Sequence, residues 1–191
     1  RGPDSHKEKS GTPTMGGVII AIVSFFSMLL WTDLANNRVL LVLLSMFVFA
    51  ALGYFDDRSK MMSKSAEGGA SRIFKLIPQI GFGILLGCVL IFPELGIFQG
   101  PGTEGDAFFV PFLKSPLFHL SWGALLWGII WCGGVTNAVN YTDGLDGLLT
   151  VPAFFGFLVL GVFSFVHGNI LLADYLYFPY FAGAGELAVV C

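Results

Sequence analysis

Long apolar stretches separated by short polar connections dominate this chain. Each of five such stretches approaches the roughly 20 residues that an α-helix needs to cross the hydrocarbon of a bilayer. They cover residues 15–31, 39–55, 77–92, 117–135 and 151–166, and a sixth begins near Gly185. The pattern predicts an all-α fold: one polytopic bundle of transmembrane helices over residues 1–191, with five complete spans and one truncated span.

The composition agrees with a lipid environment. The chain is 55% hydrophobic and 12% charged, with a mean hydropathy of +0.77, whereas soluble domains carry about 25% charged residues. A net charge of −3 argues against nucleic acid as a partner, because no basic stripe neutralises phosphates. Because the sequence starts at Arg1 and stops within an apolar stretch at Cys191, we expect an internal fragment, cut at both ends.

The polar connections fall into two sets of opposite charge character. The first set, residues 1–14, 56–76 and 136–150, contains eight of the ten lysines and arginines, and the second contains only Arg38 and Lys114. The second set comprises residues 32–38, 93–116 and 167–184. Positive residues gather on the cytoplasmic side of membrane proteins, so the first set is predicted to be cytoplasmic. Residues 93–116, rich in glycine and proline, are predicted to hold a small hairpin outside the membrane.

Two adjacent aspartates follow the second apolar stretch, in the pattern Asp56-Asp57-x-x-Lys60. An aspartate at the centre of a transmembrane helix costs roughly 2.5 to 3.5 kcal/mol, so acids beside hydrocarbon are functional candidates. On a helix, Lys60 would share a face with both carboxylates. Such a group can hold Mg²⁺ and phosphate together, or act as a base. A solvated helix end with a charge cluster is the alternative interpretation.

A second polar cluster ends the fourth apolar stretch, at residues 137–147 (NAVNYTDGLDG). Its amides and acids recur at a spacing of three and would lie on one face if the segment is helical: Asn137, Asn140, Asp143 and Asp146. The glycines within it would let a ligand approach the backbone closely. The spacing of a calcium-binding loop is absent. The alternative interpretation is a structural turn with capping aspartates.

Two glycine-containing segments complete the pattern. Residues 11–17 (GTPTMGG) follow Lys7 and Lys9 and are typical of a helix N-terminus, while the Gly-Lys-Ser/Thr ending of a phosphate-binding loop is absent. Gly83 and Gly87 have the spacing that lets two membrane helices approach closely. The latter pattern predicts helix packing rather than chemistry.

Residues 11–17, 56–60 and 137–148 together resemble the phospho-N-acetylmuramoyl-pentapeptide transferase family, integral membrane enzymes that make lipid I for bacterial peptidoglycan. Residues 5–6, 174–180 and 183–187 also look like that family. The resemblance covers nearly the whole chain in the expected order.

The resemblance implies transfer of phospho-MurNAc-pentapeptide from UDP-MurNAc-pentapeptide to undecaprenyl phosphate, with release of UMP and a requirement for Mg²⁺. By this analogy Asp56, Asp57 and Lys60 are catalytic, and Asp57 is also a metal ligand. Which aspartate acts as base stays open. The implied substrate-binding residues are Lys9, Thr14, Asn140, Asp143, Gly144, Leu145 and Asp146. The implied location is the bacterial cytoplasmic membrane with the site facing the cytoplasm, and a homodimer is left open.

The resemblance has two departures. Glu67 stands where the family usually has a lysine, which casts doubt on a phosphate contact there unless Lys64 compensates. The family's further magnesium-binding aspartate and histidine-rich segment would lie beyond Cys191, so we expect the fragment alone to be inactive.

Two other functions are alternatives to this transferase. A related polyprenyl-phosphate N-acetylglucosamine-phosphate transferase would share the aspartates and the metal. A membrane transporter would instead place its acids near the middle of spans.

Overall fold

The computed structural model describes residues 16–63, 71–92, 105–110, 113, 115–143 and 148–191. Its elements in chain order are α1 (Gly16–Trp31), α2 (Asn37–Ser63), α3 (Arg72–Ile91), β1 (Ala107–Phe108), β2 (Phe118–His119), α4 (Gly123–Thr142), α5 (Thr150–Gly168), α6 (Ile170–Tyr175), the 3₁₀ turn η3 (Ala184–Glu186) and α7 (Leu187–Val190). The all-α membrane bundle predicted from the sequence is confirmed. Lys9, Thr14, Glu67, Gly144, Leu145 and Asp146 lie outside the described residues.

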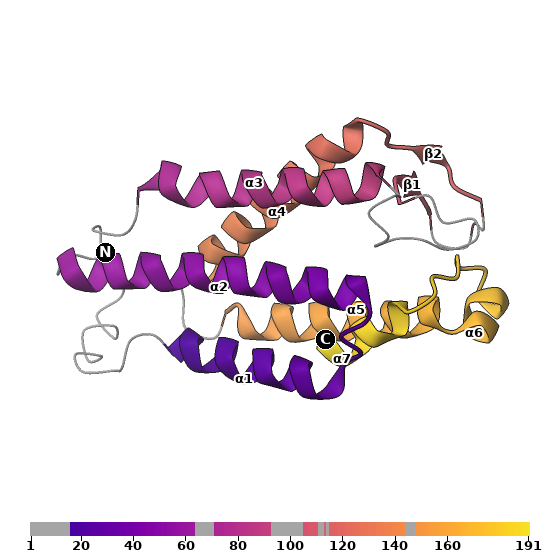
Figure 1. The fold of residues 1–191 in the computed structure, drawn as a ribbon, viewed down its shortest axis with the longest axis horizontal. Coiled ribbons are helices and arrows are strands. Elements are labelled where there is room, and N and C mark those ends of the chain that lie inside the picture. Colours follow the sequence, from indigo (N-terminus) through magenta and orange to yellow (C-terminus); the bar gives the residue numbers. More distant parts are fainter. Residues whose placement is uncertain (1–15, 64–70, 93–104, 111–112, 114, 144–147) are drawn as a thin grey trace.

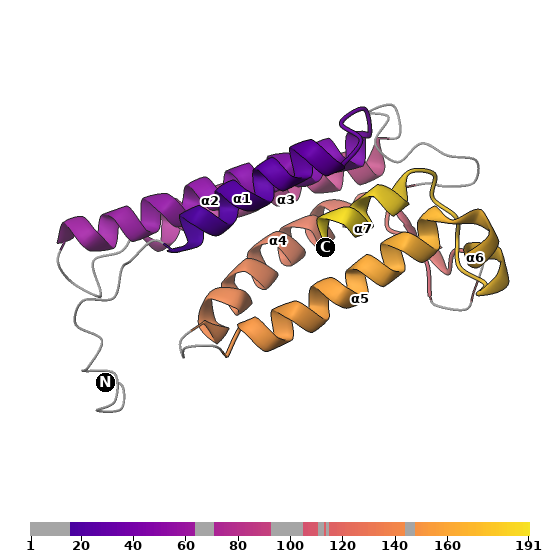
Figure 2. The ribbon, with the colours of Figure 1, turned by 90° about the horizontal axis from the view of Figure 1, so that it is seen from below.

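The long helices form two layers. Figure 2 shows α1, α2 and α3 in one layer, with α4, α5 and α7 in the other. The small buried core lies where α1, α2 and α7 meet and is built around Met28, Val39 and Leu43. Most apolar side chains of these helices are exposed, and α5 has no buried residue. This distribution suits a bundle whose solvent is lipid.

Three helices of the described part are long and apolar enough to cross a membrane by length and composition: Asn37–Met62, Ile73–Ile91 and Thr150–Gly168. Helix α1 is apolar but shorter, at 16 residues. Helix α2 has 27 residues and, at 1.5 Å per residue, is roughly 40 Å long, whereas the hydrocarbon core is about 30 Å thick. One end of α2 must therefore reach the polar interface.

Two helices extend past the apolar stretches that predict them. Helix α2 continues to Ser63 and α4 continues to Thr142, so the predicted connections 56–76 and 136–150 are helical in part. The reason is that backbone hydrogen bonding continues beyond the membrane wherever no proline or glycine interrupts it. Helix α4 begins only at Gly123, because Phe118 and His119 pair with β1 instead.

Helices α3 and α4 cross at a contact made by glycines. A Cβ on Gly83 would lie 2.7 Å from Ile129 Cα, and one on Gly87 would lie 2.6 Å from Leu125 Cα. Both distances are shorter than any side chain tolerates, so the backbones approach this closely only because the glycines lack side chains. The packing role predicted for these glycines is confirmed. Figure 1 shows the crossing of α3 over α4.

The β-hairpin and the C-terminal segment occupy the end of the bundle opposite to the end where α2 finishes (Figure 1). There Asn36 Nδ2 donates a hydrogen bond to Gly183 O over 2.7 Å, and the Asp33 backbone N–H donates to Glu186 Oε2 over 3.0 Å. These bonds tie the α1–α2 connection to the segment before α7.

Candidate active site

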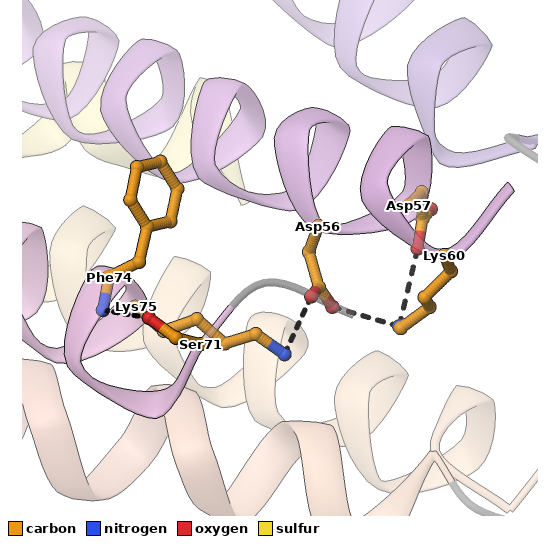
Figure 3. A network of polar contacts seen from close by, with 6 residues as sticks. All are labelled: Asp56, Asp57, Lys60, Ser71, Phe74 and Lys75. Carbon is orange, nitrogen blue, oxygen red and sulfur yellow. Dashed lines mark hydrogen bonds and ion pairs between the residues drawn. The ribbon is translucent and has the colours of Figure 1, made fainter. Parts of the chain in front are cut away.

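Asp56 is the centre of a charge cluster near the C-terminal end of α2. It is only 8% exposed, and its two carboxylate oxygens each meet an ammonium group. Lys60 Nζ lies 2.8 Å from Oδ2, and Lys75 Nζ lies 2.7 Å from Oδ1. Figure 3 shows the two lysines approaching the carboxylate from opposite sides. A nearly buried carboxylate stays ionised at low cost only with partners of this kind.

Local structure places each of these side chains. Lys60 follows Asp56 by one helical turn, as the sequence predicts. Lys75 comes from the first turn of α3, whose N-terminus is capped by Ser71 Oγ accepting from the Phe74 N–H over 3.2 Å. The cap fixes where α3 begins and therefore where Lys75 stands relative to α2.

Asp57 differs from its neighbour in exposure. Its side chain is 50% exposed, and its Oδ1 lies 3.5 Å from Lys60 Nζ. Asp56 is thus occupied by two cations, while Asp57 presents much of its carboxylate to solvent. Of the two, Asp57 is the carboxylate available to a ligand.

A cavity of about 270 Å³ adjoins Asp56 where α2, α3 and α4 meet. It receives Asp56 from α2, Lys75 and Gln79 from α3, and Asn137 and Asn140 from α4. Thus the structure joins parts of the two acidic clusters that the sequence separates by some 80 residues. The shared face predicted for Asn137 and Asn140 is observed in the lining of this cavity.

Asp143 is placed differently. It is the exposed C-cap residue of α4 and is not among the described residues that line the cavity. Within the described residues, no group of three or more histidine, cysteine, aspartate or glutamate side chains gathers in one place. Among these described residues, no third acidic side chain joins Asp56 and Asp57.

The sequence did not single out Lys75 or Gln79 as site residues. Lys75 flanks the third apolar stretch of the sequence, and its contact with Asp56 joins two helices. The sequence offers one signal for Gln79: it is a lone glutamine in an apolar stretch, where polar residues are rare. In the structure its side chain is only 5% exposed.

A second cavity reaches Asp57 from the apolar side of α2. Its volume is about 590 Å³, and it lies between α1 and α2. The lining is almost entirely apolar, with Phe47, Ala50 and Tyr54 among its residues, and Asp57 is at one end. A hydrocarbon chain with a charged head is the kind of molecule that such a cavity can accommodate.

Fold and site together define a multi-pass membrane protein with paired carboxylates and two lysines at one end of its bundle. Comparison with known proteins makes this specific. Residues 39–188 match glycosyl transferase family 4, and residues 9–20 match the first signature of phospho-N-acetylmuramoyl-pentapeptide-transferase. The chain belongs to glycosyl transferase family 4.

A curated relative points the same way. Over 190 residues the chain is 38% identical to the phospho-N-acetylmuramoyl-pentapeptide-transferase of Desulfotalea psychrophila (strain LSv54 / DSM 12343). The match covers 100% of this chain and 50% of that relative, so the chain spans about half the length of the curated relative it matches. The family resemblance inferred from the sequence is confirmed.

Proposed function

We propose that a full-length protein carrying this sequence transfers phospho-MurNAc-pentapeptide from UDP-MurNAc-pentapeptide to undecaprenyl phosphate in peptidoglycan synthesis. The observation that carries the proposal is Asp56, held between Lys60 and Lys75 beside a cavity that also receives Asn140. The matched signature over residues 9–20 favours the muramoyl donor over the N-acetylglucosamine donor of a related transferase.

Release of UMP defines which bonds change. An oxygen of the lipid phosphate attacks the phosphorus that bears the sugar, and the anhydride bond to UMP breaks. A phosphate monoester has a second pKa of about 6 and is therefore mostly a dianion near pH 7. The larger obstacle is repulsion between this dianion and the diphosphate, rather than removal of a proton. Lys60 and Lys75 supply positive charge against that repulsion.

The roles of the two aspartates follow from their surroundings. Asp56 positions both lysines, and they in turn compensate its own nearly buried charge. Asp57, with its exposed carboxylate, is placed to bind a cation or to accept the proton that the minor, monoanionic form of the lipid phosphate still carries. The apolar cavity between α1 and α2 ends at Asp57, which suits a substrate with a polyprenyl chain.

The donor chemistry at this site fits Mg²⁺. This ion is usually held by one or two carboxylates together with substrate phosphates and water, and the half-exposed carboxylate of Asp57 offers oxygen ligands of this kind. When bound, Mg²⁺ would offset the negative charge of the diphosphate. The further substrate contacts proposed are those of Lys9, Thr14, Asp143, Gly144, Leu145 and Asp146.

The positive residues of the first set of connections support a cytoplasmic position for this end of the bundle, where nucleotide donors are present. We therefore propose the bacterial cytoplasmic membrane as the location. Eight positive residues against two support that orientation.

The decisive experiment is UMP release by the full-length protein in detergent, with undecaprenyl phosphate, UDP-MurNAc-pentapeptide and Mg²⁺. Release that requires both substrates and is lost with EDTA is expected. Turnover of UDP-N-acetylglucosamine instead would keep the chemistry and overturn the donor, and no turnover of either donor by folded protein would overturn the function.

Asp57→Asn should lower UMP release at least about 10³-fold, because a neutral amide neither accepts the proton nor binds the cation as a carboxylate does. Asp33→Asn is the matched control at the opposite end of the bundle. There the side chain only accepts from the Ala35 N–H, over 2.9 Å, as an asparagine also can. Equal activity of the two variants would contradict the role of Asp57.

A further inference from the structure

A pair of amides, Gln79 buried and Asn137 half-buried, joins α3 to α4 beside the site. Gln79 is 5% exposed, and its Oε1 accepts a hydrogen bond from Asn137 Nδ2 over 3.0 Å. The same nitrogen donates to Gly133 O over 2.6 Å. Both donor positions of the Asn137 amide are therefore used, one within α4 and one between the helices.

The pair stands between the glycine crossing and the charged groups. Along α3, Gln79 lies one turn after Lys75, which contacts Asp56, and one turn before Gly83, which contacts α4. Along α4, Asn137 lies one turn before Asn140, which lines the cavity. Residues one turn apart share a helix face, so the pair connects the packing contact to the site.

The glycine contact alone does not determine how α4 is rotated. Surfaces without side chains allow close approach, but van der Waals contact is not directional. A hydrogen bond between two amides is directional, and it is strengthened where water is excluded. Buried polar pairs of this kind are known to select one register between helices.

We propose that Gln79 is a positioning residue for nucleotide-donor binding: by holding Asn137, it sets the rotation of α4 that turns Asn140 toward Asp56 and Lys75. This inference rests on the proposed function and adds a residue to it. Gln79 acts through α4, because its Oε1 is engaged by Asn137 and little of its surface is exposed.

The test is a double-mutant cycle in the full-length protein, measured as UMP release at varied concentrations of each substrate. Gln79→Met keeps the length of the side chain and removes the acceptor. We expect the KM for UDP-MurNAc-pentapeptide to rise about tenfold, the usual scale for one lost buried hydrogen bond, with the KM for undecaprenyl phosphate changed less than about twofold. In an Asn140→Ala background, the same substitution should add less than about twofold, because its effect passes through Asn140.

Two further variants separate positioning from packing. Gly83→Ala disturbs the same helix pair without touching the amides, and its effect should multiply with that of Asn140→Ala. The exchanged pair, Gln79→Asn with Asn137→Gln, keeps the combined side-chain length and should restore the KM for the donor to within about threefold. If Gln79→Met does not yield folded protein, Gln79→Asn alone, which is one methylene too short, replaces it in the cycle.

Effects of Gln79→Met and Asn140→Ala that multiply would overturn the inference and leave Gln79 as a packing residue. So would equal changes in both KM values. These results would leave the proposed function intact, since the wild type would still release UMP. An inactive wild type would overturn both.

Discussion

At the scale of single residues, the two neighbouring aspartates have different environments because a helix turns by about 100° per residue. Asp56 faces α3 and is enclosed by Lys60 and Lys75, whereas Asp57 lines the cavity between α1 and α2 and keeps half of its side-chain surface exposed. One carboxylate therefore organises the cations, while the other remains available to a ligand. The Asp-Asp sequence alone does not distinguish these roles.

Lys75→Met is expected to affect both stability and activity. Asp56 would lose one of the two lysine contacts described for it, so the free energy of unfolding should fall by about 2 kcal/mol, the scale for losing a charged hydrogen bond at a nearly buried group. UMP release should fall about 10²-fold with the loss of a phosphate-facing cation. Thermal melting and initial rates in detergent measure the two effects.

Arg58→Met is the matched control for Lys75→Met. Arg58 is an exposed cation at the same end of α2 whose Nη1 lies 3.4 Å from Tyr54 Oη. Its substitution should change stability by less than about 0.5 kcal/mol, as surface substitutions usually do. A Lys75 variant that behaves like this control would show that the contact of Lys75 with Asp56 contributes neither to stability nor to activity.

At the scale of elements, the site depends on how closely α3 approaches α4. The glycine contacts bring the two backbones together, and this approach places Lys75 and Gln79 across a small cavity from Asn140. The capped start of α3 and the length of α2 decide where along the helices the groups meet. The site is therefore a property of three helices packed in one register.

In Gly87→Ala the new Cβ would lie 2.6 Å from Leu125 Cα and force the helices apart. The free energy of unfolding should therefore fall by about 1–3 kcal/mol. Gly81→Ala is the control on the same helix. A Cβ there meets nothing within 4 Å, so removing a helical glycine should stabilise α3 by up to about 1 kcal/mol. In detergent, the melting temperature should fall for Gly87→Ala and rise for Gly81→Ala. Changes of the same sign would contradict the close crossing of α3 and α4.

At the scale of the whole molecule, the bundle has two chemically different ends. One end holds Asp56 and Asp57 with their lysines, and the other holds the short hairpin and the hydrogen bond between Asn36 and Gly183. Apolar side chains exposed along the helices separate the two ends. This division is what a membrane imposes, because hydrocarbon excludes unpaired polar groups from the middle of the bundle.

Labelling of single cysteines should report the orientation of the two ends. After replacement of the native cysteines, Met62→Cys, at a position 76% exposed, should react with a membrane-impermeant maleimide only in opened cells. Ala35→Cys, at an exposed position of the opposite end, should react in spheroplasts that are intact. The reverse pattern would contradict the orientation inferred from the lysines and arginines.

The sequence by itself determined the features that depend on neighbouring residues. Apolar length predicted the helices, the spacing of Asp56 and Lys60 predicted their ion pair, and the spacing of Gly83 and Gly87 predicted a close helix contact. The motifs also determined the family, because their residues and order are specific. Each of these signals is local, since backbone hydrogen bonds and side-chain neighbours on a helix lie within one turn.

Only the tertiary structure decided which distant residues meet. The contact of Lys75 with Asp56, the bond between Gln79 and Asn137, and the placement of Asn140 on the same cavity all join different helices. Periodicity identifies the apolar face of a helix but contains no information about which neighbour will cover it, or at what rotation. That choice depends on packing and directional hydrogen bonds summed over the bundle, and no single segment of the chain contains it.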